Sequence, residues 1–174
     1  GYYTVTAKYP LNGSPQVFVH KGTVAVGANN VKVDFNSNLI TFPPIVDLNG
    51  AGTGTGFEAE FRSLPVAIVG TTSTVTDGDN ANLSSLTAAI TNFQAGDTLD
   101  VTVSSGITKT FSAGVLTLRG SGTLSAYQTV LRTLIFNTTS TNSTSRTIAV
   151  KANDGGGDGP VATATVKIQL VTTP

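Results

Sequence analysis

The chain has 174 residues, of which 39% are hydrophobic and only 11% are charged, and its ten acidic and ten basic residues leave a formal net charge of zero. This balance, without a cluster of basic residues, argues against nucleic acid as a partner. The chain contains no Cys, which excludes a disulfide framework and a thiolate metal site. No apolar run approaches the length of a membrane span.

Thr, Ser, Asn and Gly supply the polarity that charged residues provide in most soluble domains. These residues suit solvated strand faces and tight turns, and they disfavour helices. Met and Trp are absent as well as Cys, and we therefore expect a secreted or cell-surface protein with little to oxidise. Because Gly1-Tyr2-Tyr3 does not resemble a signal peptide, we expect such a chain to be a processed form or an excised segment.

Residues 1–42 alternate between apolar and polar side chains, a pattern that predicts short strands. Turn-forming residues such as Asn12-Gly13 and Lys21-Gly22 separate the alternating runs. The expected strands cover residues 2–8, 16–20, 23–26, 31–35 and 39–42.

Pro43 and Pro44 interrupt this pattern, because two consecutive prolines offer no backbone donor to a central strand. We therefore place a domain boundary here. Residues 1–42 are expected to form an N-terminal strand-rich segment or small β domain, and residues 43–174 a second domain. The Gly-rich stretch at residues 49–56 is expected to be a loop.

From residue 57 onward the alternating runs are longer. Turn signals every eight to twelve residues or so favour an all-β antiparallel sandwich over a parallel α/β sheet, which would need alternating helices. The expected strands cover residues 57–61, 66–69, 72–76, 86–93, 98–103, 108–111, 115–118, 133–136, 147–152 and 161–171.

One segment has helical periodicity instead. Apolar residues recur at intervals of three and four between residues 124 and 134, which predicts a short helix within about residues 123–134. Thr123 or Ser125 is expected to cap it, and Ser125 with Gln128 has the spacing of a capping box. The alternative is a strand that carries apolar residues at these positions. If the helix forms, the core-facing residues are Tyr127, Val130, Leu131 and Leu134.

Eight motifs follow one another in residues 44–171 in an order that resembles a known repeat. They are VDLNGAG at 46–52, PVAI at 65–68, TDGD at 76–79, AGDTL at 95–99, LTLRGSGTLSAYQ at 116–128, LRTL at 131–134, RTI at 146–148 and ANDG at 152–155. This segment resembles the cadherin-like repeats of large bacterial surface adhesins and of repeats-in-toxin-type calcium-binding proteins.

The resemblance implies an immunoglobulin-like sandwich of two antiparallel sheets that serves as a stalk or adhesion unit. It also implies calcium, held at domain junctions by loop carboxylates. The family usually carries a Glu before the PVAI strand, where this chain has Arg62-Ser63-Leu64. The resemblance does not extend to residues 1–42.

Calcium takes six to eight oxygen ligands, which closely spaced Asp and Asn residues in loops supply. In TDGD, the alternate spacing of the two carboxylates allows both to face one point, with Gly78 permitting a sharp turn. The alternative is that these residues only form turns by bonding nearby backbone amides. Three clusters qualify as calcium ligands: Asp47 with Asn49, Asp77 with Asp79 and Asn80, and Asn153 with Asp154 and Asp158.

The residues do not predict a catalytic site. His20 is the single histidine and has no second His or Cys with which to bind a transition metal. Glu58 and Glu60 share one strand face, an arrangement compatible with a pair of glycosidase carboxylates, but without Trp to line a sugar groove we expect an exposed charged strand face. The Gly-rich runs lack the Lys-Ser/Thr ending of a phosphate loop. We therefore expect a protein that is not an enzyme.

Two functions follow from these patterns. The first is an extracellular structural or adhesion module of a bacterial surface protein, stabilised by calcium, with neighbouring repeats and a cell-surface or polysaccharide ligand as partners. The second is a subunit of an extracellular filament or surface layer that pairs identical subunits through the strand at residues 2–8. The alternative for that strand is a hairpin with residues 16–20 across Asn12-Gly13. A carbohydrate-binding module or hydrolase ranks behind both.

Four Asn-x-Ser/Thr sequences also occur, at Asn12, Asn82, Asn137 and Asn142. Such sequences mark acceptors for N-linked glycans in exported proteins. In a chain this rich in Ser and Thr such sequences often arise by chance, and a bacterial source would leave most of them unused.

Overall fold

The computed structural model describes residues 42–104 and 106–169, together with four strands within the first 41 residues. The chain divides into two compact units, Gly1–Phe42 and Pro43–Pro174. Each unit is described separately below. Among the described residues, no helix is long and apolar enough to cross a membrane.

The first unit contains β1 (Tyr2–Tyr3), β2 (Thr6–Leu11), β3 (Ser14–Val19) and β4 (Val24–Ala25). Strand β2 pairs antiparallel with β3, with two residues of sequence between them, and β1 pairs antiparallel with β4. The strand predicted at residues 2–8 thus contributes to two pairings within the unit, and the hairpin alternative describes its second part. The strand predicted at residues 31–35 lies outside the described residues, as does the one at 39–42 apart from Phe42, and so does His20.

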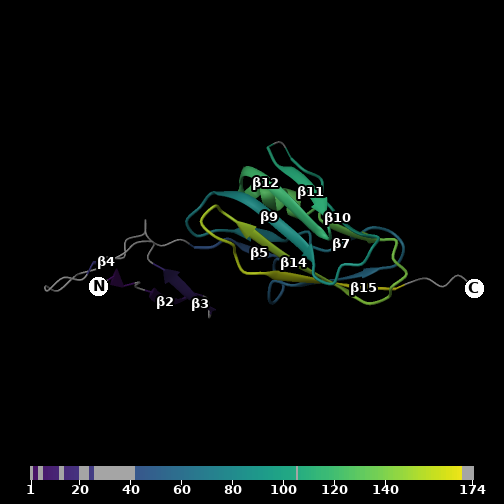
Figure 1. Ribbon diagram of the computed structural model, residues 1–174, viewed down its shortest axis with the longest axis horizontal. Coiled ribbons are helices and arrows are strands. Elements are labelled where there is room, and N and C mark those ends of the chain that lie inside the picture. The colour runs from purple at the N-terminus through teal and green to yellow at the C-terminus, as the bar shows by residue number, and fades with distance from the viewer. Residues whose placement is uncertain are drawn as a thin grey trace, which may run out of the picture. The chain divides into compact units, whose positions relative to one another are not determined.

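The second unit is an all-β sandwich with one short helix (Figure 1). Its larger sheet has the strand order β11-β12-β9-β14-β15-β6, and a smaller sheet has the order β10-β13-β7, while β5 pairs with β8. All pairs are antiparallel except β15 with β6, which is parallel. The larger sheet comprises β11 (Thr108–Ser112), β12 (Val115–Thr123), β9 (Asn82–Ile90), β14 (Arg146–Asn153), β15 (Ala162–Ile168) and β6 (Phe57–Phe61). The other strands are β10 (Asp97–Asp100), β13 (Ile135–Thr138), β7 (Val66–Ala67), β5 (Ile45–Asp47) and β8 (Thr74–Thr76).

One apolar core joins the two layers. Along β15 every second side chain is buried, as the alternation predicts, and the residues between them face outward. Phe61 of β6 and Phe136 of β13 meet edge to face across the layers, with ring centroids 5.8 Å apart and an interplanar angle of 88°. These contacts confirm the predicted all-β sandwich.

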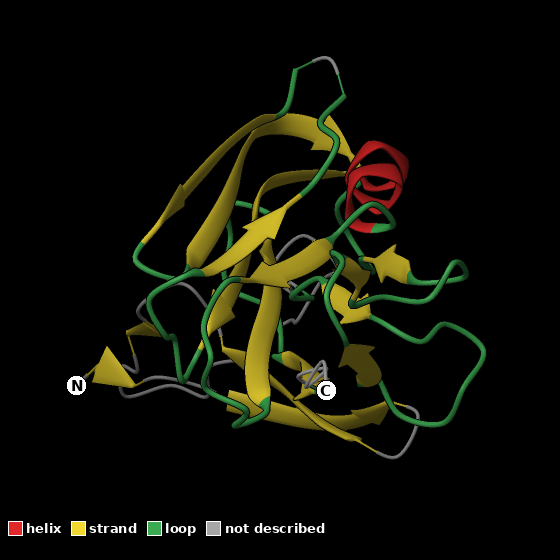
Figure 2. Ribbon diagram, turned by 90° about the vertical axis from the view of Figure 1, so that its right-hand side faces the viewer, coloured by secondary structure: helices red, strands yellow, loops and turns green. Residues whose placement is uncertain are grey.

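The predicted helix is present as α1 (Leu124–Leu131), and it packs against β8, β9 and β12 (Figure 2, red). The four residues that the helical periodicity assigned to the core are all buried: Tyr127, Val130, Leu131 and Leu134. The backbone N–H of Ala126 donates to the Thr123 hydroxyl at 3.1 Å, which makes Thr123 the N-cap.

The capping box predicted for Ser125 and Gln128 is wrong. The Gln128 side-chain oxygen instead accepts from the backbone N–H of Val75 in β8, at 3.2 Å. The long side chain therefore connects the helix to strand β8 rather than closing its own first turn.

Strand β12 extends five residues beyond the predicted end at Leu118 because it contains a β-bulge. The register with β9 shifts between Arg119 and Gly122, leaving one extra residue on β12. Gly120 lies within this bulge at φ +133°, where a Cβ would be 2.0 Å from the backbone oxygen of Gly106. Its own carbonyl accepts a hydrogen bond from the Tyr127 hydroxyl at 2.6 Å. The bulge thus connects the strand to the helix that follows it.

Arg146 and Asp97 form an ion pair between the two layers, from β14 and β10. Arg146 Nε donates to Asp97 Oδ2 at 2.7 Å, and both side chains are 0% exposed. The same oxygen accepts from the backbone N–H of Gln94 at 2.9 Å. The other guanidinium nitrogens donate to the carbonyls of Thr144 and Asn142. Both charges are therefore removed from water, and each depends on the other.

Replacing Asp97 with Ala should destabilise the second unit by about 3–5 kcal/mol, because the Arg146 charge would stay buried without its partner. Urea denaturation followed by circular dichroism measures this change. Asp100→Ala is the matched control. Asp100 lies in the same strand but forms its ion pair, with Lys109, at the surface, so its effect should be far smaller. Equal effects of the two substitutions would contradict the importance of the buried pair.

The two candidate helix caps also differ in their expected effects. Thr123→Ala should lower the free energy of unfolding by about 1 kcal/mol, because the N–H of Ala126 loses its acceptor. Ser125→Ala, two residues along and exposed, should change it little. Thermal unfolding of both variants measures the difference, and a larger loss for Ser125→Ala would contradict this assignment.

Candidate cation site

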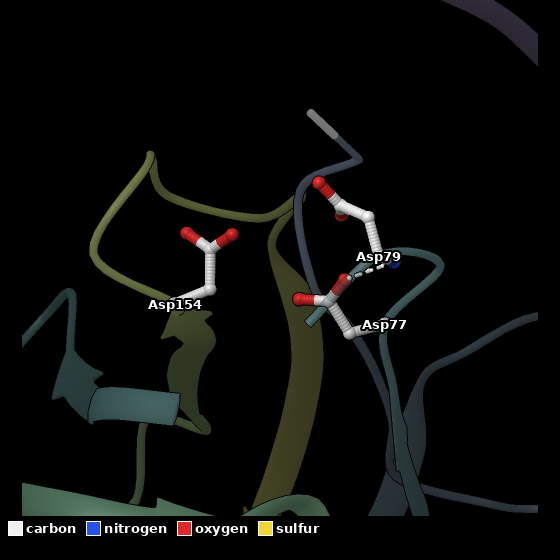
Figure 3. Close-up of side chains that lie close together, drawn as sticks. All are labelled: Asp77, Asp79 and Asp154. Carbon is white, nitrogen blue, oxygen red and sulfur yellow. Dashed lines mark hydrogen bonds between the residues drawn. The ribbon is translucent and has the colours of Figure 1, made fainter. Parts of the chain in front are cut away.

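Three carboxylates from two loops of the second unit converge (Figure 3). Asp77 and Asp79 lie in the loop between β8 and β9, and Asp154 lies in the loop between β14 and β15. One carboxylate oxygen from each lies within 4.8 Å of the others. Asp77 and Asp154 are half-buried, and Asp79 is exposed. Residues more than seventy positions apart in sequence thus meet in space.

Each loop is shaped by one oxygen of its own Asp. Asp77 Oδ1 accepts from the backbone N–H groups of Asp79 and Asn80, both at 3.0 Å. Asp154 Oδ1 does the same for Gly156 at 2.7 Å and Gly157 at 3.0 Å. These are the turn-forming contacts of Asp, and they leave the second oxygen of each carboxylate for other contacts.

The two second oxygens have different surroundings. Asp154 Oδ2 accepts from the Asn80 side-chain amide at 2.7 Å, which joins the two loops directly. Asp77 Oδ2 is buried without a hydrogen-bond partner. Burial raises the pKa of Asp77, and the neighbouring Asp79 carboxylate adds to this rise, while the two backbone N–H donors oppose it. A buried acceptor without a partner is costly, so this oxygen fits a position that a cation would satisfy.

Both acidic loops lie beside the first residues of the second unit. Ile45 of β5 lies opposite Thr76 of β8, so the preceding residue, Pro44, runs beside the Asp77 loop. Gly159 of the other loop approaches Pro44 so closely that a Cβ would lie 1.7 Å from the Pro44 carbonyl oxygen. The two acidic loops therefore flank residues 43–45. In Figure 3 this segment of the chain passes beside the carboxylates.

The cluster predicted at Asp47 and Asn49 lies elsewhere, at the end of β5 and in the loop between β5 and β6. Asp47 Oδ1 accepts from the backbone N–H groups of Asn49 at 3.0 Å and Gly50 at 2.9 Å. The Asn49 amide donates to the Thr53 carbonyl at 3.1 Å. Among the described residues, this loop does not join the group of three carboxylates.

Asn153 and Asp158 lie at the base of the Asp154 loop and bond to each other. The Asn153 amide donates to Asp158 Oδ1 at 2.7 Å, and Lys151 donates to Asp158 Oδ2. The hydrogen bond from Lys151, with that from Asn153, lowers the pKa of Asp158. Asn153 Oδ1 accepts from the Gly155 backbone and from the Ser84 hydroxyl. Asn153 and Asp158 thus stabilise the loop through contacts of their own. Of the eight predicted ligands, Asp77, Asp79 and Asp154 come together, and Asn80 contacts Asp154.

Glu58 and Glu60 are exposed on β6. Glu58 pairs with Lys167 at 2.8 Å, and Glu60 pairs with Arg62 at 2.8 Å. The two carboxylates thus lie on a charged outer face of an edge strand, a placement that opposes pairing with other chains.

Comparison of the chain with known protein families, curated proteins and solved structures gave no match.

Asp77→Asn should raise the melting temperature of the protein in excess chelator. The Asn oxygen can still accept from both backbone N–H groups, while the substitution removes a charge that burial and Asp79 disfavour. Because the folded-state pKa of Asp77 is raised, its contribution to stability is present below the ordinary Asp pKa and is lost as pH rises through the raised value. The gain from Asn should therefore be larger at pH 7 than at pH 4.

Asp47→Asn is the control for this substitution, because Asp47 forms the same kind of turn outside the carboxylate group. Differential scanning calorimetry in chelator compares the two variants with the parent chain. The prediction is contradicted if Asp77→Asn lowers the melting temperature by as much as Asp47→Asn does. In that case Asp77 would contribute only through its turn.

Proposed function

We propose that this chain is a non-enzymatic structural or adhesion module of an extracellular surface protein, stabilised by Ca²⁺ between its acidic loops. The observation that carries the proposal is the convergence of Asp77, Asp79 and Asp154 around a buried, unpartnered Asp77 oxygen. In the metal-free chain these carboxylates repel one another. A cation would neutralise them and join two loops that flank the beginning of the unit.

The ligand chemistry favours calcium over other ions. The cluster offers carboxylate and amide oxygens, which are ligands for hard cations. Calcium accepts six to eight such oxygens in flexible geometry, whereas magnesium requires a near-ideal octahedron of shorter bonds. Asp77, Asp79 and Asp154 would hold the ion, and the Asn80 side chain could turn its oxygen toward it, with water completing the shell.

The residues that carry the cadherin-like resemblance support a structural role. Asp97 and Arg146, from the motifs AGDTL and RTI, form the buried ion pair between the layers. Tyr127 and Leu131, from the motifs around α1, are buried in the core. These motif residues therefore maintain the fold itself, as a module whose role depends on its shape requires. Neighbouring repeats and a cell-surface or polysaccharide ligand are the partners that such a module would have.

The alternative, a filament or surface-layer subunit, depends on exchange of the N-terminal strand between identical chains. Strands β1 and β2 are paired with β4 and β3 within their own unit. A strand whose backbone groups are already hydrogen-bonded within its own unit has fewer free donors and acceptors for pairing with the sheet edge of another chain. The module is therefore the preferred function.

Calcium should raise the melting temperature of the full chain. For a dissociation constant of about 10⁻⁴ to 10⁻³ M, typical of extracellular modules, 10 mM Ca²⁺ stabilises the folded state by about 1.4–2.7 kcal/mol. This corresponds to a rise of several degrees, which chelator should reverse. Differential scanning calorimetry with and without chelator measures it.

Asp79→Ala and Asp154→Ala should abolish the response to calcium, and Asp47→Asn should keep it. Magnesium at the same concentration should stabilise the chain less, which separates site binding from general screening of charge. Identical melting temperatures in calcium and chelator would contradict the calcium site, and so would an unchanged response in the Asp79 and Asp154 variants.

A further inference from the structure

Asn142 starts an Asn-x-Thr sequence in the loop between β13 and β14, and its three residues, Asn142, Ser143 and Thr144, are all exposed. The Thr144 backbone N–H donates to Asn142 Oδ1 at 2.8 Å. This Asx turn holds the carboxamide of Asn142 close to the residue that carries the Thr144 hydroxyl. Within the described residues, neither Asn142 Nδ2 nor the Thr144 hydroxyl forms a hydrogen bond, and both residues are exposed.

We propose that Asn142 is an attachment site for an N-linked glycan. The acceptor would be its side-chain nitrogen, and the donor a polyprenyl-diphosphate-linked oligosaccharide used by an oligosaccharyltransferase. Asn142 Nδ2 forms a bond to the anomeric carbon of the first sugar, the bond from that carbon to the diphosphate breaks, and the diphosphate leaves with the electron pair. One Nδ2 proton passes to a base of the transferase. The proposal goes beyond the module function and does not depend on calcium.

The loop is anchored by the framework. Arg146, buried beside Asp97, donates to the carbonyls of Thr144 and Asn142. The Ser140 hydroxyl accepts from the backbone N–H of Asn142 at 3.2 Å. These contacts use backbone atoms and leave the acceptor side chain outside, so the fold presents the sequence without engaging it.

The other two described sequences are held differently. Asn82 lies in β9 opposite Thr123, and its third residue, Ser84, donates its hydroxyl to Asn153. Asn137 lies in β13 opposite Thr98 and is half-buried. In β9, an extended strand, the side chains of Asn82 and Ser84 stand about 6.6–6.8 Å from each other along one face. Neither strand can enter the acceptor site of the oligosaccharyltransferase without losing its pairing within the sheet. Asn12 and Gly13 lie outside the described residues.

The test uses the folded full chain, a purified single-subunit oligosaccharyltransferase that requires only the three-residue sequence, and a short lipid-diphosphate-linked oligosaccharide. Intact mass and glycopeptide mapping follow modification at each Asn over time. Asn142 should be modified at least about tenfold faster than Asn82 and Asn137, because those two must wait for local unfolding of a strand. Short synthetic peptides that contain each sequence serve as unfolded references and should differ much less.

Asn142→Gln and Thr144→Val should remove the modification, and Thr144→Ser should retain it. Asn82→Gln is the matched control and should leave modification of Asn142 unchanged. The proposal is overturned if the folded chain leaves Asn142 bare while its peptide is modified, or if the peptide itself is refused. Equal rates at Asn82, Asn137 and Asn142 in the folded chain would overturn it as well.

Discussion

The buried ion pair between Arg146 and Asp97 constrains both layers of the sandwich. Two charges without access to water require each other, because an unpaired buried charge costs far more than the pair contributes. The pair is therefore less a source of stability than a restriction on which arrangements are allowed. A shift of β14 by one residue would turn Arg146 to the outer face and leave Asp97 alone in the interior. The same guanidinium holds the carbonyls of Asn142 and Thr144, so the loop between β13 and β14 shares this constraint.

Periodicity in the sequence predicted most of the second unit, because alternation reports burial directly. It gave the buried and exposed faces of β15, and the helical stripe identified the residues that α1 buries. It could not predict the ion pair, since Asp97 and Arg146 are far apart in sequence and neither stands out among ordinary surface charges. It missed β5 as well, a strand of three residues that follows two prolines and precedes a Gly-rich loop. The end of β12 depended on Gly120, whose role in the bulge is visible only when β9 lies beside it.

The sequence predicted which residue types form the candidate cation site, but not which of the candidate residues come together. Asp47 and Asp77 have the same local chemistry, since each accepts two backbone N–H groups with one oxygen. Nothing local to either residue distinguishes a turn former from a ligand. The difference comes from the pairing of β5 with β8 and from the approach of Gly159 to Pro44, which bring the Asp154 loop beside Asp77. Asp158 had the right residue type, but Lys151 and Asn153 occupy both of its oxygens.

An Asx turn uses one of the two polar atoms at the end of its side chain, and the surroundings of the other atom decide what the residue can do. For Asp77 the second oxygen is buried near other carboxylates, which favours a cation. For Asp154 it accepts from Asn80 and connects two loops. For Asn142 the second atom is a nitrogen at an exposed position, which favours chemistry with an external reagent. The sandwich core thus fixes where each turn lies, while the surroundings of the second atom set the chemistry that each turn could support.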